Sequence, residues 1–215
     1  LGLWGRCRNC RTRISIQYPL VELTVGIIFA SLFFKLFAQI GSNILIFAVT
    51  FLYYATLFSL LVIIATYDLK HKIIPDMLSF VFGALAFIGL FFFMNNNFFI
   101  SPVFSLHVPS ILDFFSGILI ALPFALFWLI SSGKWMGLGD AKLALCIGWL
   151  LGINNALSGL AVAFWLGAII GIILVIFLKN SKISKQGMKS EIPFAPFLVL
   201  GAFLAFIFNL NFFRI

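Results

Sequence analysis

Charged residues are scarce in this sequence. Asp, Glu, Lys and Arg make up only 9% of the 215 residues, whereas soluble domains carry about 25%. With 63% hydrophobic residues and a mean hydropathy of +1.19, the chain is excluded from the ordinary soluble class and is expected to lie in a lipid bilayer. The formal net charge of +8 therefore bears on membrane topology, and no nucleic-acid partner is expected.

Cysteine is scarce as well. The three cysteines are too few for a disulfide framework. Cys7 and Cys10 form a CxxC pair in a basic, polar segment, which is half of a tetrahedral zinc site. A second pair upstream or in a partner chain would complete the site, and this chain alone favours no bound metal. Cys146 lies in an apolar run and is expected to be a small packing residue. The basic, polar N-terminal segment predicts no secretory signal peptide.

Long apolar runs dominate what is present. A helix crosses the hydrocarbon core in about 20 residues. Seven segments are candidates: 19–40, 43–67, 75–94, 110–131, 139–153, 155–178 and 193–213. The sequence thus predicts an all-α, polytopic transmembrane bundle of about seven spans at 19–215, after a separate cytoplasmic CxxC segment at 1–18. The fifth segment is short, and a re-entrant segment there would leave six full spans.

The distribution of the basic residues tests this assignment of spans. If seven spans alternate in direction, one side carries residues 1–18, 68–74, 132–138 and 179–192, which hold 11 of the 14 basic residues, and Lys142 lies near the same side. The positive-inside rule makes that side, and the N-terminus, cytoplasmic. Six spans would put the Lys-rich 179–192 segment outside, so the charge pattern favours seven.

Only six residues are acidic, and two of them are predicted to share one membrane face. Asp68 ends the second span, and Asp140 opens the fifth within Gly137-Leu138-Gly139-Asp140. Two close carboxylates can hydrolyse a peptide bond: the ionised one takes a proton from water, and the protonated one polarises the carbonyl. The two glycines would allow close approach of a neighbouring helix or a substrate.

The alternative is that these acids only cap helices. An anion is favourable near a helix N-terminus, which fits Asp140 and Asp76 but not Asp68, at a C-terminal end. Pro75 and Asp76 begin the third span, where helix initiation and a functional role remain equally open. Glu22, one turn into the first span, is expected to pair with an arginine of residues 1–18 rather than to lie in the site. Asp113 is expected to support the start of the fourth span.

Five motifs together resemble a known family. They are the CxxC at 7–10, Tyr-Pro-Leu-Val-Glu-Leu at 18–23, Asp68 with Ile74-Pro75-Asp76, Gly-Leu-Gly-Asp-Ala-Lys-Leu at 137–143, and Pro-Phe-Ala-Pro-Phe at 193–197. In this order they look like bacterial prepilin peptidase, the type IV prepilin leader peptidase/N-methyltransferase among the GxGD aspartyl proteases. The resemblance covers nearly the whole chain. It implies that Asp68 and Asp140 are catalytic, with the following as substrate-binding or supporting residues: Glu22, Pro75, Asp76, Gly137, Gly139, Lys142, Pro193 and Pro196.

The resemblance also implies a substrate and a location. The family removes the basic leader of type IV prepilins or pseudopilins at the cytoplasmic face of the bacterial inner membrane. Proteolysis by two aspartates needs no cofactor, and many members then methylate the new N-terminus with S-adenosylmethionine. The family's additional N-terminal helix and first CxxC are not in this sequence, which weakens the expectations of zinc and methyl transfer more than that of proteolysis. Ala195 stands where the family commonly has glycine.

Two other functions are alternatives. A presenilin-like or signal-peptide-peptidase-like intramembrane protease shares Tyr67-Asp68 and the Gly-Leu-Gly-Asp motif, but its Pro-Ala-Leu motif near the end is missing. A cation or proton transporter would use the two aspartates as an ion path. Transport sites are expected near the bilayer midplane, whereas both acids are predicted at one interface.

Overall fold

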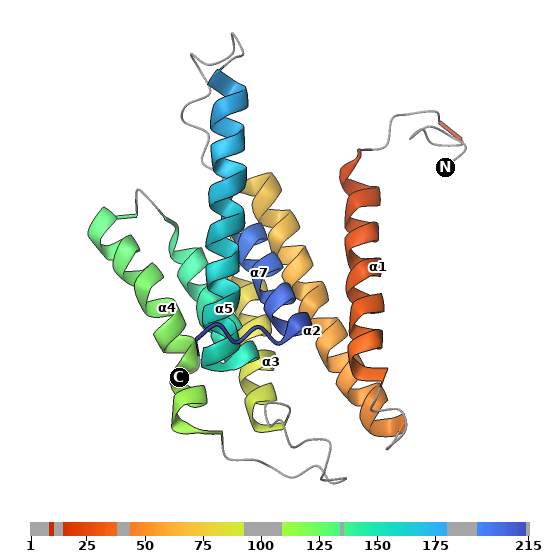
Figure 1. Cartoon of the computed structure of the whole chain (residues 1–215). Helices are drawn as coiled ribbons and strands as arrows, with labels where there is room; N and C mark the ends of the chain where they lie inside the picture. Colours follow the sequence, from red (N-terminus) through yellow and green to blue (C-terminus); the bar gives the residue numbers. More distant parts are fainter. Residues whose placement is uncertain are drawn as a thin grey trace. The chain divides into compact units, whose positions relative to one another are not determined.

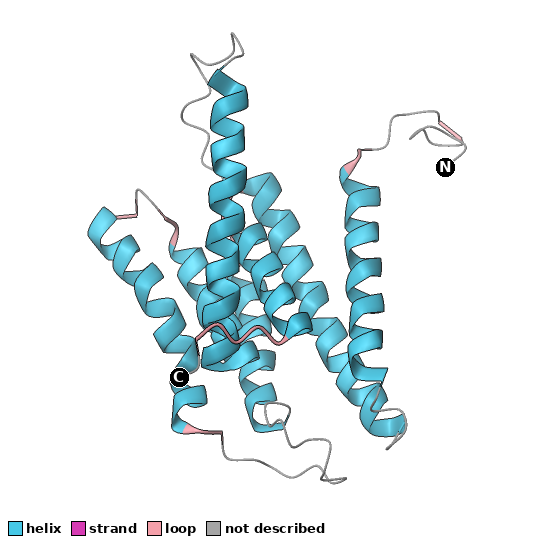
Figure 2. Cartoon of the chain, in the orientation of Figure 1, coloured by secondary structure: helices cyan, strands magenta, loops and turns pink. Residues whose placement is uncertain are grey.

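The computed structural model describes residues 9–10, 15–37, 44–92, 109–133, 136–179 and 193–213. Helices are the only regular secondary structure in these ranges (Figure 2). They are α1 (Gln17–Leu36), α2 (Ile44–His71), α3 (Asp76–Phe92), α4 (Ile111–Ser131), α5 (Leu138–Lys179) and α7 (Ala195–Phe208). Among them α1, α2, α4 and α5 are long and apolar enough to cross a bilayer, and α3 and α7 are shorter apolar helices. The chain is a multi-pass helical membrane protein, as the composition predicts.

The chain forms two compact units, residues 1–62 and 63–215, and the boundary falls inside α2. In the first unit, α1 packs on the beginning of α2 through phenylalanine rings. Phe33 meets Phe47 edge to face at 5.9 Å between ring centroids, and Phe29 meets Phe51 at 6.0 Å. Because the residue numbers run in opposite directions along the two helices, α1 and α2 are antiparallel here. The predicted separate segment at 1–18 lies largely outside the described residues and stays a prediction.

The second unit is organised around α5, which contacts α3, α4 and α7 (Figure 1). This long helix is broken at Gly152, whose backbone (φ 72°, ψ 170°) is far from helical. A positive φ of this size suits glycine, because a Cβ would clash with the backbone. Gly152 therefore divides α5 into a first arm, residues 138–151, and a second arm, residues 153–179.

The two arms run in opposite directions. In the first arm, the carbonyl of Leu145 lies against Gly117 of α4, and Trp149 donates its indole N–H to the carbonyl of Phe114, nearer the start of α4. In the second arm, Phe164 stacks with Phe124, further along α4, at 6.0 Å between ring centroids. Before the break the chain runs toward the start of α4, and after the break it runs toward the end of α4. Gly152 therefore makes the chain reverse, and both the start and the end of α5 lie toward the end of α4.

Small residues bring the helices of this unit into close contact. A Cβ built on Gly148 would lie 2.6 Å from the Cα of Gly117 in α4, closer than real Cβ contacts. At the same place Ser116, which is fully buried, donates its hydroxyl hydrogen to the Gly148 carbonyl at 2.9 Å. Apolar side chains gain little by leaving lipid for a protein interface, so such backbone approach and interhelical hydrogen bonding are what hold membrane helices together.

Gly148→Ala is expected to destabilise the protein by about 1–3 kcal/mol, because the added methyl meets backbone atoms that cannot rotate away. The matched control is Gly171→Ala in the second arm, where an added Cβ meets nothing within 4 Å. Alanine is the better helix former, so this control should leave the melting temperature in detergent unchanged or raise it. Equal melting temperatures for the two variants would contradict the packing described here.

Candidate active site

Asp68 lies in the last turn of α2 and is only 6% exposed. The helix ends there because Lys72 adopts the left-handed conformation (φ 55°) and donates its N–H to the carbonyl of Asp68 at 2.7 Å. A carboxylate at the C-terminal end of a helix is disfavoured by the helix dipole, and burial in an apolar bundle disfavours it further. Asp68 therefore needs a compensating partner from elsewhere in the fold.

The start of α7 is that partner. The carboxylate of Asp68 accepts a hydrogen bond from the backbone N–H of Ala195, the first residue of α7. No side chain of its own caps this end of α7, and the first N–H groups of a helix have no partners within it. Asp68 thus lies at the positive end of α7, and Ala195 is completely buried beneath it.

Asp140 lies at the other side of the site, in the first turn of α5. Its side chain is half-buried, and its carboxylate accepts a hydrogen bond from the backbone N–H of Gly137. Asp140 also lies within electrostatic range of Asp68. The structure therefore brings two carboxylates from separate helices within electrostatic range of each other, near the starts of α5 and α7.

The glycines of the Gly137–Asp140 motif differ in their surroundings. A Cβ on Gly139 would lie 3.0 Å from the Cβ of Ile74, in the connection between α2 and α3. Gly137 is more open, since a Cβ there would meet its nearest atoms at 3.9 and 4.0 Å. A close approach is thus found at Gly139, but its neighbour is the connection that follows Asp68 and not another helix; approach of a substrate to the two glycines stays a prediction.

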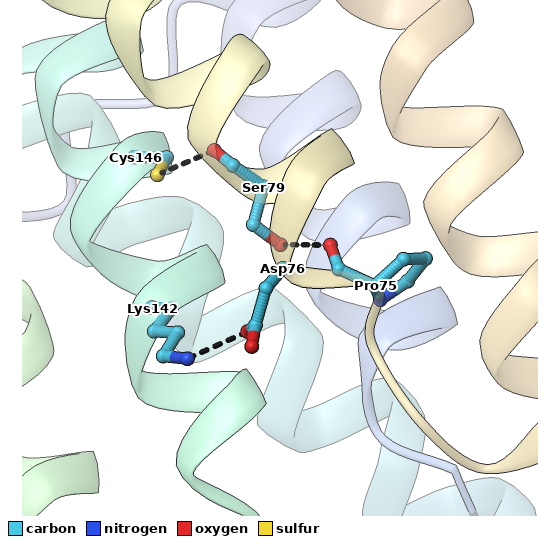
Figure 3. A network of polar contacts seen from close by, with 5 residues as sticks. All are labelled: Pro75, Asp76, Ser79, Lys142 and Cys146. Atoms are coloured by element: carbon cyan, nitrogen blue, oxygen red, sulfur yellow. Dashed lines mark hydrogen bonds and ion pairs between the residues drawn. The ribbon is translucent and has the colours of Figure 1, made fainter.

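Lys142 and Asp76 form an ion pair that links α5 to α3 (Figure 3). The Lys142 Nζ donates to the Asp76 Oδ1 at 2.6 Å. Asp76 is the first residue of α3, and Pro75 just before it accepts hydrogen bonds from the backbone N–H and the hydroxyl of Ser79. Helix initiation, one of the two roles left open for Pro75 and Asp76, is therefore what this geometry provides.

The remaining predicted residues are placed as follows. Pro193 precedes α7 and Pro196 lies in its first turn, so both flank the residue that donates to Asp68. Glu22 is exposed on α1, in the other compact unit, and its role stays a prediction. Cys7 lies outside the described residues, while Cys10 is exposed in a turn. Within the described ranges no three His, Cys, Asp or Glu side chains are grouped to hold a metal.

Sequence reasoning missed two features of this site. One is the backbone N–H of Ala195, which no side-chain pattern could indicate, although the proline-flanked start of a helix marks its position. The other is the pairing of Lys142 with Asp76. The sequence did hold a signal for that pair: the two residues carry opposite charges, and both lie at predicted span ends on the same side of the membrane.

Comparison with known families decides what kind of protein carries this site. The model of the type IV leader peptidase family matches residues 55–176, and that of the bacterial peptidase A24 N-terminal domain matches residues 1–36. The chain belongs to the type IV leader peptidase family. The first match includes Asp68 and Asp140. No solved structure matches the chain significantly.

Curated relatives agree along nearly the whole chain. The prepilin leader peptidase/N-methyltransferase of Legionella pneumophila is 32% identical over 95% of this chain and 63% of its own length. The protein with the same description from Neisseria gonorrhoeae is 28% identical over 97% of this chain and 64% of its own. The one from Bacillus subtilis is 30% identical over 95% and 71%. The chain thus spans somewhat less than two thirds of the length of the first two of these relatives.

Two isosteric substitutions should have opposite effects on stability. Asp113 in the first turn of α4 accepts a hydrogen bond from the hydroxyl of Ser110 at 2.7 Å, while the Ser110 side chain accepts one from the Asp113 N–H, as expected for a helix start. Asp113→Asn removes a favourable anion and should lower the melting temperature. Asp68→Asn removes a buried anion that faces Asp140, so it should raise the melting temperature at neutral pH. A decrease for both variants would contradict the repulsion inferred at the site.

Proposed function

We propose that this protein is a membrane aspartyl endopeptidase that removes the basic leader of type IV prepilins or pseudopilins at the cytoplasmic face of the bacterial inner membrane. The observation that carries the proposal is the approach of Asp68 and Asp140 at the meeting point of two helix starts. The family membership and the descriptions of the relatives support the substrate class.

The proposed chemistry uses the two carboxyl groups as a unit. The ionised one removes a proton from a water molecule, whose oxygen attacks the carbonyl carbon of the scissile bond. The protonated one gives its proton to the carbonyl oxygen, which yields a tetrahedral intermediate. As the intermediate collapses, the C–N bond breaks and the leaving amine takes the proton that the first carboxylate removed from water. The second carboxylate takes a proton back from a hydroxyl of the intermediate as the new carboxyl group forms. The two groups share one proton, so their ionisation belongs to the pair rather than to either residue.

This reaction needs no cofactor. Methyl transfer from S-adenosylmethionine, and zinc bound by Cys7 and Cys10 with a second pair, stay predictions from the resemblance. A presenilin-like protease would use the same chemistry, but the family match favours the leader peptidase. The transporter is not favoured, because Asp68 and Asp140 lie at helix ends and not at mid-helix.

The proposed topology is seven spans with a cytoplasmic N-terminus. The reversal at Gly152 supports it, because the two arms of α5 then count as two spans and place α7 antiparallel to the second arm. That direction agrees with the contact of the Ser158 hydroxyl, near the start of the second arm, with the backbone N–H of Phe212, beyond the end of α7. Asp68, Asp140 and the start of α7 would all lie at the cytoplasmic side.

The topology can be tested by labelling single cysteines in a Cys7→Ser, Cys10→Ser, Cys146→Ala background. With a membrane-impermeant maleimide, Lys72→Cys should be labelled in inside-out vesicles and Asn211→Cys in right-side-out vesicles. Both sites are exposed in the structure. Labelling of both cysteines from the same side would indicate an even number of spans between residues 72 and 211, whereas seven spans place five there, and it would reject the proposed topology.

Cleavage of a prepilin by the purified protein in detergent tests the proposed activity. Asp68→Ala and Asp140→Ala should each reduce cleavage by at least about 10³-fold, and the double variant should be no worse than either one, because residues that act as a unit are not additive. Asp113→Asn, measured well below its melting temperature, is the control for loss of an acidic residue. Undiminished cleavage by either Ala variant would contradict the proposed two-aspartate mechanism. Ion flux abolished by the same changes, without proteolysis, would support a transporter.

A further inference from the structure

The ion pair between Asp76 and Lys142 lies next to the proposed active site but on the opposite side of α5. Lys142 follows Asp140 by two residues, which corresponds to about 200° around a helix. Asp140 can therefore face Asp68 while Lys142 faces Asp76 on α3 (Figure 3). The same turn of α5 holds one group of the candidate dyad and one anchor to a neighbouring helix.

A second contact links the same elements. Gly139 packs against Ile74, and the connection that contains Ile74 joins the end of α2 to the start of α3. That connection spans only residues 72–75, so Asp68 and Asp76 are covalently tied over a short distance. Asp68 is thus linked through this connection to Asp76, then through the ion pair to Lys142, and along α5 back to Asp140.

We propose that Asp76 and Lys142 are a positioning pair, which holds the first turn of α5 against α3 and thereby keeps Asp140 in register with Asp68. The inference rests on the proposed proteolytic function for its kinetic consequence. Neither residue touches the reacting atoms in this proposal. Their contribution is the placement of a carboxylate whose distance from its partner decides whether the two can share a proton.

The exposure of the Asp76–Lys142 ion pair indicates that its role is to position Asp140 and not to stabilise the fold. The Asp76 and Lys142 side chains are 78% and 43% exposed, and exposed ion pairs contribute little to stability. Small displacements of catalytic groups have large kinetic effects, since a 1 Å misplacement costs up to about 10²-fold in rate. A weak contact can therefore matter to turnover while the fold tolerates its loss.

The α3–α5 contact continues one turn further, at Cys146. This thiol is buried and donates to the carbonyl of Ser79 on α3 at 3.6 Å. Ser79 is one turn beyond Asp76, and Cys146 is one turn beyond Lys142. Access of a reagent to Cys146 thus reports whether α3 and the first arm of α5 stay together, without any measurement of activity.

The kinetic test compares Asp76→Ala, Lys142→Ala and the swapped variant Asp76→Lys/Lys142→Asp on a prepilin substrate. Each single variant should lower kcat about tenfold with KM nearly unchanged, and the swap should return kcat to within about threefold of wild type. Lys70→Ala, which removes an exposed lysine near the end of α2, is the matched control and should behave as wild type. Increased KM with no recovery in the swap would overturn the proposal and indicate that the two charges bind the substrate instead.

The second test follows labelling of Cys146 by the permeant thiol reagent N-ethylmaleimide in a Cys7→Ser, Cys10→Ser background. Labelling should be slow in that background and with Lys70→Ala, several-fold faster with Asp76→Ala or Lys142→Ala, and slow again in the swapped variant. Equal rates in all of them would overturn the positioning role. If the unaltered protein did not cleave prepilins, the proposed function would fail, and labelling would still decide whether the pair holds the two helices together.

Discussion

Two carboxylates placed close together in an apolar helix bundle are the constraint on which the rest of this structure depends. Burial and mutual repulsion both oppose the ionised pair. The compensation comes from helix starts: the N–H of Ala195 at the beginning of α7 faces Asp68, and the N–H of Gly137 just before α5 faces Asp140. Both donors belong to the backbone at or just before a helix start, so these helix starts themselves stabilise the site.

This compensation requires that α5 and α7 begin at the same end of their unit. The reversal at Gly152 meets that requirement, because the second arm of α5 returns toward the level at which the first arm started. Close packing keeps the arrangement compact: Gly148 lies against Gly117 of α4, and Gly139 against Ile74. A larger side chain at these glycines would move a helix whose first turn carries or faces a catalytic candidate.

Several parts of this arrangement were predictable, because they depend on neighbours in the sequence. Hydropathy indicated the helices, and the helix ends at Asp68 and Asp140 were found where the apolar runs stop and start. The support that Asp113 provides at the start of α4 and the buried packing of Cys146 were also confirmed. The division of residues 139–178 into two helical segments was also predicted, and the break falls at Gly152, two residues before the predicted boundary at residue 154. The reversal of the chain at this glycine was not visible in the apolar pattern, since a positive φ leaves no mark on hydropathy.

The sequence by itself determined the membrane class, the family motifs and the two aspartates that any mechanism must explain. It could do so because hydropathy, turn residues and rare acids act locally or stand out against an apolar background. Only the tertiary structure decided that Asp68 faces the start of α7, that Lys142 pairs with Asp76, and that Gly139 packs on Ile74. These contacts join residues 65 to 127 positions apart, and helix packing, which no local pattern encodes, sets which of the possible partners meet.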